Sequence, residues 1–124
     1  MGKAREGGVR PHHNLEAWKQ GIELVKAVYE LTKSFPKEEL FGLTSQIRRA
    51  AVSVPSNIAE GAARSGDQEF AQFLNIAKGS VSELETQLVI AVELGYLASD
   101  DDLFVVLDRV SRLVTGLHKA VRKP

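Results

Sequence analysis

The chain has 124 residues, no cysteine and no net charge, since 16 Lys and Arg balance 16 Asp and Glu. This length suits one domain whose core needs neither disulfides nor metal. Without cysteine there is no disulfide framework or thiolate metal site, which suits a reducing cytoplasm. Neutrality argues against a strongly basic nucleic-acid binder, and without an apolar run of about 18 residues no membrane span is predicted.

Residues 1–13 are predicted to form a flexible N-terminal arm, because they contain three glycines and a proline but no apolar segment. His12 and His13 fall in this arm and are interpreted as part of it, not as metal ligands. Residues 14–122 are predicted to form the folded domain.

The first helix is expected over residues 15–34, with Asn14 as its N-cap. One apolar face follows spacings of three and four and is predicted to be the core face: Leu15, Trp18, Ile22, Val25 and Tyr29. Further apolar residues lie away from that face: Leu24, Val28, Leu31 and Phe35. Pro36 is expected to end the helix, because a residue before proline is disfavoured in helical conformation.

A second helix is expected over residues 43–63, with a core face of Leu43, Ile47, Ala50, Val54, Ile58 and Gly61. Pro55 lies inside this run and is predicted to kink the helix or to begin a new one.

The third and longest helix is expected over residues 68–94, with its apolar stripe at Phe70, Phe73, Leu74, Ala77, Val81, Leu84, Leu88, Ala91 and Val92. Gly79 and Ser80 are interpreted as permitting close approach of another helix. Gly95 is predicted to stop the helix.

For the fourth helix, Ser99 is the predicted cap and Asp100 to Asp102 the first turn. A heptad-like seam follows at Leu103, Leu107, Val110, Val114, Leu117 and Val121. The connections between the four helices are short, so sequential helices should be antiparallel neighbours. The predicted fold is therefore all-α, an antiparallel up-down-up-down four-helix bundle.

The middle helices carry apolar residues outside their core stripes, at Val52, Pro55, Ala59, Ala63, Ile76 and Ile90. A bundle needs one buried stripe per helix, and extra apolar surface bordered by polar groups is typical of an interaction site. The favoured hypothesis is homo-oligomerisation through this second face. The alternative is a wide core stripe with scattered exposed apolar residues.

Polar residues form a separate stripe on the same helices: Gln46, Arg49, Ser53, Asn57, Glu60 and Glu83. They are predicted to form a structural hydrogen-bond network, within the subunit or across an interface, because buried polar groups must pair. A catalytic carboxylate pair of Glu60 and Glu83 is the alternative.

No catalytic, cofactor or metal site is predicted. The histidines are His12, His13 and His118, and none stands three residues after a glutamate, as in di-metal helical bundles. Phosphate-binding loops of the GxxxxGK type and serines near a histidine base are absent from the sequence.

The charges are unevenly distributed. From Asp67 to Asp108 there are nine acids and one lysine, whereas residues 109–124 hold five bases and no acid. Interaction of these charges with helix ends is the favoured explanation. A nucleic-acid surface is the alternative, and its candidate contacts are Arg48, Arg64, Arg109, Arg112, Lys119 and Arg122.

The run from Phe41 to Gly61 is long and distinctive: FGLTSQIRRAAVSVPSNIAEG. Further motifs are EF at 69–70, FL at 73–74, IA at 76–77, GS at 79–80, ELETQL at 83–88, LEAW at 15–18 and LGY at 94–96. Together, from about Asn14 to Lys119, they resemble a bacterial four-helix-bundle family first named for proteins encoded in intervening sequences of large-subunit ribosomal RNA genes.

This resemblance implies an up-down bundle that assembles as a ring-like homo-pentamer. It also implies a relationship to the accessory protein of diversity-generating retroelements, which associates with a reverse transcriptase and nucleic acid. Those accessory proteins are markedly basic, whereas this chain has no net charge. Gln46, Arg49, Asn57, Glu60 and Glu83 match the family's polar positions and are interpreted as structural or interface residues.

The leading functional hypothesis is a non-enzymatic, homo-oligomeric, cytoplasmic scaffold associated with RNA or an RNA-handling protein. The alternative is a protein–protein interaction module with no nucleic-acid contact. An enzyme that uses Glu60 and Glu83 is the third hypothesis.

Overall fold

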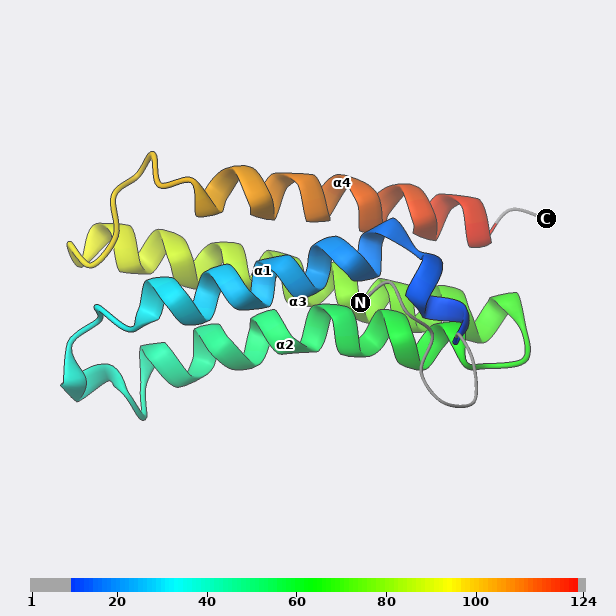
Figure 1. Cartoon of the computed structure of the whole chain (residues 1–124), viewed down its shortest axis with the longest axis horizontal. Coiled ribbons are helices and arrows are strands. Elements are labelled where there is room, and N and C mark those ends of the chain that lie inside the picture. The colour runs from blue at the N-terminus through cyan, green and yellow to red at the C-terminus, as the bar shows by residue number, and fades with distance from the viewer. Residues whose placement is uncertain (1–9, 123–124) are drawn as a thin grey trace.

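A computed structural model describes residues 10–122, and within them the chain is helical, with no strand. The four α-helices are α1 (Glu16–Thr32), α2 (Leu43–Ala62), α3 (Asp67–Glu93) and α4 (Leu103–Val121), with short 3₁₀ helices η1 (Pro11–Asn14) and η2 (Lys37–Glu39). The prediction of an all-α chain with four helices is confirmed. Figure 1 shows the chain passing back and forth along the long axis, one helix at a time.

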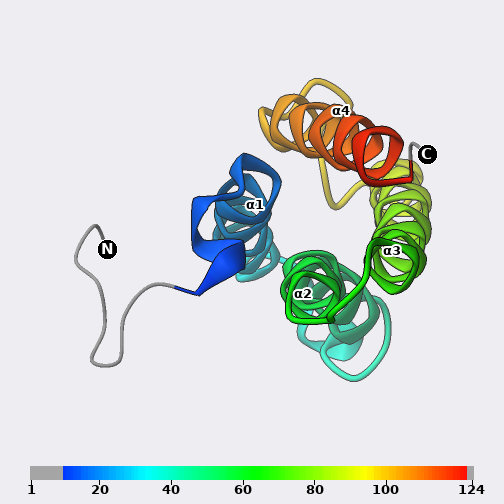
Figure 2. The same ribbon diagram turned by 90° about the vertical axis from the view of Figure 1, so that its right-hand side faces the viewer.

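The helices pack side by side around one core. Each helix contacts the next in sequence, and α1 also contacts α4, so that the end-on view of Figure 2 shows a closed set of four. The largest fully buried side chains come from all four helices: Leu24, Val28, Ile47, Val54, Ile58, Leu74, Leu84, Leu88, Val110 and Val114. The predicted core stripes of α2, α3 and α4 supply eight of these ten residues.

The predicted core face of α1 is wrong. Leu24 and Val28 are fully buried, whereas Leu15, Trp18 and Val25 are only partly buried against the core. Tyr29, also predicted to be inside, is 41% exposed. The face that α1 buries also carries the small residues Ala17 and Gly21, and small side chains let a neighbouring helix approach closely.

That neighbour is α2, at Pro55. A Cβ atom added to Gly21 would lie 3.3 Å from the Cβ of Pro55, so the two helices are in close contact here. No new helix begins at Pro55, because α2 continues from Leu43 to Ala62 with Pro55 buried inside it. Proline costs a helix one backbone hydrogen bond, and burial of its ring against α1 offsets part of that cost.

The junction of α2 with α3 depends on a second glycine, Gly61. A Cβ on Gly61 would lie 2.7 Å from the Cβ of Phe73 and 2.9 Å from Cδ1 of Phe70. Distances this short exclude any larger residue without movement of α3. Gly61 therefore lets the two phenylalanines lie over the end of α2.

The helix ends differ in detail from the prediction. Gly95 has φ +82°, and the amide of Tyr96 donates to the carbonyl of Ala91 at 2.9 Å, which confirms Gly95 as the stop of α3. α4 begins later than expected, at Leu103, and Oδ1 of Asp101 accepts from the Leu103 amide at 2.9 Å, so Asp101 takes the role predicted for Ser99.

The end of the predicted arm is folded back on the bundle. Residues 1–9 lie outside the described part, but Pro11 to Asn14 form η1, which contacts α1 and α2. The rings of His12 and His13 lie 4.9 and 5.3 Å from the ring of Trp18. Asn14 belongs to this turn and does not cap α1. Packing against a large aromatic ring explains why these residues are ordered.

No helix among residues 10–122 is long and apolar enough to cross a membrane.

Candidate interaction surfaces

A small polar cluster joins α2 to α3. The hydroxyl oxygens of Ser53 and Ser80 lie 2.7 Å apart, and Nδ2 of Asn57 donates to Oγ and to the carbonyl of Ser53, at 2.9 and 2.8 Å. Ser80 is buried, whereas Ser53 and Asn57 are half-buried. Their mutual bonds satisfy groups that would be costly to leave unpaired, so two of the six predicted network residues do form a network, together with Ser80.

The other four predicted network residues do not join this cluster. Gln46 and Arg49 are exposed on α2. Oε2 of Glu60 forms an ion pair with Nη2 of Arg64, four residues further along the chain, at 2.9 Å. Oε2 of Glu83 accepts from Nε2 of Gln87 at 3.2 Å, while Oε1 of the buried Gln87 has no hydrogen-bond partner among the described residues.

The proposed carboxylate pair of Glu60 and Glu83 is not formed. The contacts of Ser53 with Ser80 and of Gly61 with Phe73 show that α2 and α3 run in opposite directions. Glu60 follows Ser53 by seven residues on α2, and Glu83 follows Ser80 by three residues on α3. Because the two helices run in opposite directions, Glu60 and Glu83 lie on opposite sides of the serine pair along the bundle axis. At 1.5 Å of rise per residue the backbones of Glu60 and Glu83 are about 15 Å apart along the bundle axis, so their carboxylates do not form a pair.

Two arginines proposed for nucleic-acid contact have aromatic partners within the bundle. The guanidinium of Arg48 lies 4.6 Å from the ring centre of Tyr29, and its Nε donates to Oγ1 of Thr32 at 2.8 Å. Arg64 lies 4.8 Å from the ring centre of Phe73, in addition to its ion pair with Glu60. Both side chains are thus held by neighbouring residues.

On α4 the proposed contacts differ from one another. Arg109 donates to Oε1 of Gln20 on α1 at 3.3 Å, and Arg112 pairs with Asp108 at 3.1 Å. Lys119 and Arg122, near the end of α4, form no ion pair with any residue between 10 and 122. Of the six proposed contacts, Lys119 and Arg122 are therefore the most available to an external anion.

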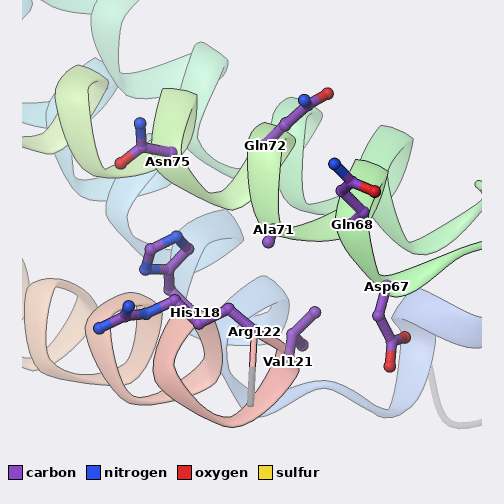
Figure 3. A pocket seen from close by; sticks show the side chains of 8 residues that line it. All are labelled: Asp67, Gln68, Ala71, Gln72, Asn75, His118, Val121 and Arg122. Atoms are coloured by element: carbon purple, nitrogen blue, oxygen red, sulfur yellow. The ribbon is translucent and has the colours of Figure 1, made fainter. Parts of the chain in front are cut away.

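An open pocket of about 550 Å³ lies where the start of α3 meets the end of α4 (Figure 3). Its lining consists of Asp67, Gln68, Ala71, Gln72, Asn75, His118, Val121 and Arg122. Burial first, and then the positive charges of Lys78 and Arg122, lower the pKa of His118 below its usual 6.5. His118 and Arg122 thus line this pocket together with the carboxylate of Asp67 and three side-chain amides.

The predicted oligomer face is exposed in part. Exposed fractions are 40% for Val52, 51% for Ile76 and 43% for Ile90, and Ala63 is also exposed while Ala59 is half-buried. The prediction that Pro55 belongs to this face is wrong, because Pro55 is buried against Gly21 inside the bundle.

Exposed apolar residues also occur where the sequence patterns did not indicate them. Phe41 is 93% exposed in the loop before α2, and Val105 is 60% exposed on α4. A signal for Phe41 was present, since the apolar pair Leu40-Phe41 stands in a connector and not in a helix. Val105 lies on α4 outside the heptad-like seam of Leu103, Leu107 and Val110.

Among residues 10–122, no three His, Asp or Glu side chains gather to form a group that could hold a metal ion.

Residues 13–116 match the family model described as 23S rRNA-intervening sequence protein. This stretch covers all of α1, α2 and α3 and most of α4. No curated protein matches the chain.

Proposed function

The chain belongs to the 23S rRNA-intervening sequence protein family, and from that premise we propose that it is a non-enzymatic, homo-oligomeric scaffold, a ring-like pentamer that contacts RNA or an RNA-handling protein in the cytoplasm. The unit of this assembly is an antiparallel up-down-up-down four-helix bundle. The helix order of Figure 1 and the contacts between successive helices support that unit.

Self-association is supported above all by the outer surface of α2 and α3. Val52, Ile76 and Ile90 each keep two fifths or more of their surface exposed, although the bundle already buries a full apolar stripe from each helix. Exposed apolar groups bordered by polar ones are typical of interfaces. Burial of these groups against other copies would remove apolar area from water.

The non-enzymatic part of the proposal is supported by the placement of the two carboxylates considered for catalysis. Glu60 is paired with Arg64 and Glu83 with Gln87. Their separation along the axis leaves no common reacting position between them.

RNA contact is supported by Lys119, Arg122 and the neighbouring pocket. Each subunit offers only two of the proposed contacts without a partner among the described residues, but a ring repeats them in every copy, and phosphate affinity rises steeply with the number of bases that contact it. The alternative, a module that binds only protein, is supported by zero net charge and by the intramolecular partners of Arg48, Arg64, Arg109 and Arg112.

Sedimentation velocity over the micromolar range tests self-association. We expect one oligomeric species, and a protein that stays monomeric throughout this range would overturn the assembly.

Gel-shift titrations at low and moderate salt test RNA contact. The variant Lys119→Ala/Arg122→Ala should weaken binding of single-stranded RNA by about tenfold or more and reduce its salt dependence. The control Lys26→Ala/Lys33→Ala also removes two positive charges, but from α1 and its C-terminal cap, and should bind as the wild type does. Absence of any shift at low salt would favour the protein-only module.

A further inference from the structure

The glycines inside the helices fall into two kinds. Gly21 and Gly61 are required by contacts within the bundle, as described above. A Cβ added to Gly79 or Gly116 would meet no atom within 4 Å. Glycine weakens the interior of a helix relative to alanine, so nothing within the described subunit accounts for these two.

Gly79 lies at the centre of an exposed row on α3. This row, the α3 stripe, has spacings of three, four, three and four residues: Ile76, Gly79, Glu83, Thr86 and Ile90. With 100° per residue the row lies on the side of α3 opposite the buried Leu74, Val81 and Leu88.

Gly116 belongs to a matching exposed row on α4. This α4 stripe has spacings of four, three, four and three: Val105, Arg109, Arg112, Gly116 and Lys119. It lies opposite the buried seam of Leu103, Leu107 and Val110. Both stripes consist of exposed residues and face away from the core, so they are open to contact with another copy.

We propose that the α3 stripe of one copy packs antiparallel against the α4 stripe of another copy. One register matches all five positions, because the α4 spacings read backwards equal the α3 spacings read forwards. This register aligns Gly79 with Gly116, Glu83 with Arg112 and Ile90 with Val105. It also places Thr86 beside Arg109, and Ile76 beside the aliphatic part of Lys119.

The chemistry of the aligned pairs fits close helix packing. Gly79 and Gly116 facing each other let the two helix backbones approach closely, which accounts for glycine at both positions. Ile90 and Val105, 43% and 60% exposed in the subunit, cover each other. The charges are complementary, because α3 holds five acids and one lysine, whereas α4 holds Arg109, Arg112 and Lys119 against Asp108 alone.

The ion pair of Arg112 with Asp108 does not prevent Arg112 from pairing with Glu83 of another copy. The side chains of Arg112 and Asp108 are 81% and 62% exposed, and ion pairs in water are weak. Arg112 can therefore exchange Asp108 for Glu83 of the second copy at little cost.

This inference rests on the proposed self-association and specifies its contact. The two stripes are different surfaces, so each copy uses one stripe toward each of two neighbours. Such head-to-tail contacts generate a ring when the rotation between copies closes.

Charge reversal tests the register in solution. Glu83→Arg or Arg112→Glu alone should weaken association by about tenfold or more in sedimentation velocity, because each places like charges opposite one another. The double variant Glu83→Arg/Arg112→Glu should restore association to within about threefold, since the pair is re-formed with its signs exchanged. Restoration also shows that the single variants did not simply fail to fold.

Cysteine crosslinking tests the same register covalently, in a chain that has no cysteine of its own. The matched pairs Ile90→Cys/Val105→Cys and Gly79→Cys/Gly116→Cys should give ladders of linked chains on oxidation. The control Ile90→Cys/Gly116→Cys is offset by 11 residues, about 16 Å of helix, which exceeds the reach of a disulfide, and should give none.

The outcomes separate the two proposals. A wild-type chain that stays monomeric would overturn the assembly and this contact together. Wild-type oligomers whose association is unchanged by both single charge reversals, or which crosslink equally through the offset control, would overturn this contact and leave the assembly standing.

Discussion

Tyr96 Oη donates a 3.0 Å hydrogen bond to Oε2 of Glu39, which ties the turn after α3 to the loop before α2. The other carboxylate oxygen of Glu39 accepts from the amide of Leu43 at 3.2 Å, at the first residue of α2. One side chain thus satisfies a free helix amide and links two loops that are 57 residues apart in sequence.

This bond raises the pKa of Tyr96 above its usual 10.0; the hydrogen bond to Glu39 is the main cause, followed by burial and by the charges of Glu39 and Glu38. Because the pKa in the folded state exceeds that in the unfolded chain, the contribution to stability is present below pH 10 and is lost as pH rises through the folded pKa. We expect Glu39→Gln to lower the pKa of Tyr96, as followed by phenolate absorbance in a Tyr29→Phe background. Glu38→Gln, which removes charge but no bond, should have a smaller effect, and equal effects would contradict the assignment.

Gly61→Ala should destabilise the bundle by about 1–3 kcal/mol, although alanine is the better helix former. The reason is the 2.7 Å approach of the new Cβ to the Cβ of Phe73. Urea unfolding of dilute, dissociated chain measures the change. Gly79→Ala is the matched control, since its Cβ meets no atom within 4 Å, and it should stabilise the dissociated chain by about 0.5–1 kcal/mol.

Arg48→Ala should destabilise the fold by about 1–3 kcal/mol, because it removes a charged hydrogen bond to Thr32 and the cation–π contact with Tyr29. Arg48→Lys keeps the charge but cannot reproduce the Nε bond, so it should recover only part of the loss. Thermal unfolding measures both variants. If Arg48 instead served RNA, the variants would reduce RNA affinity while leaving the melting temperature unchanged.

His118 should titrate below pH 6.5, since burial and then the charges of Lys78 and Arg122 disfavour its protonated form. A pKa lowered on folding contributes stability that is present above pH 6.5 and is lost as pH falls through the folded pKa. We expect Lys78→Ala to move the pKa upward in an NMR titration. Lys26→Ala, a lysine of α1 that pairs with Glu23, serves as the control and should leave it in place.

Periodicity predicted the cores of α2, α3 and α4 because each of these helices has one dominant apolar stripe. α1 has two apolar stripes of similar size, and the spacing of its residues favours the one that contains Trp18 and Tyr29. The structure buries the other, where Gly21 leaves room for Pro55. Which stripe is buried depends on the shape of α2, and that information is not local to α1.

The polar sites show the same division between local and distant information. Ion pairs such as Arg64 with Glu60 follow from residues four positions apart and can be foreseen. The contact of Ser53 with Ser80 spans 27 residues and depends on the relative register of two helices. Spacing within α2 therefore predicts that Ser53 shares a polar stripe with Glu60. In the structure, Ser53 instead contacts Ser80 of α3.

The turn η1 gives the chain a built-in optical probe. Trp18 is the only tryptophan, and the rings of His12 and His13 lie within about 5 Å of it. Indole emission depends on the surroundings of the ring, so the fluorescence of the unlabelled protein reports whether η1 is packed against Trp18. Assembly and RNA titrations followed by tryptophan emission would therefore show, without any added label, whether η1 responds to a partner.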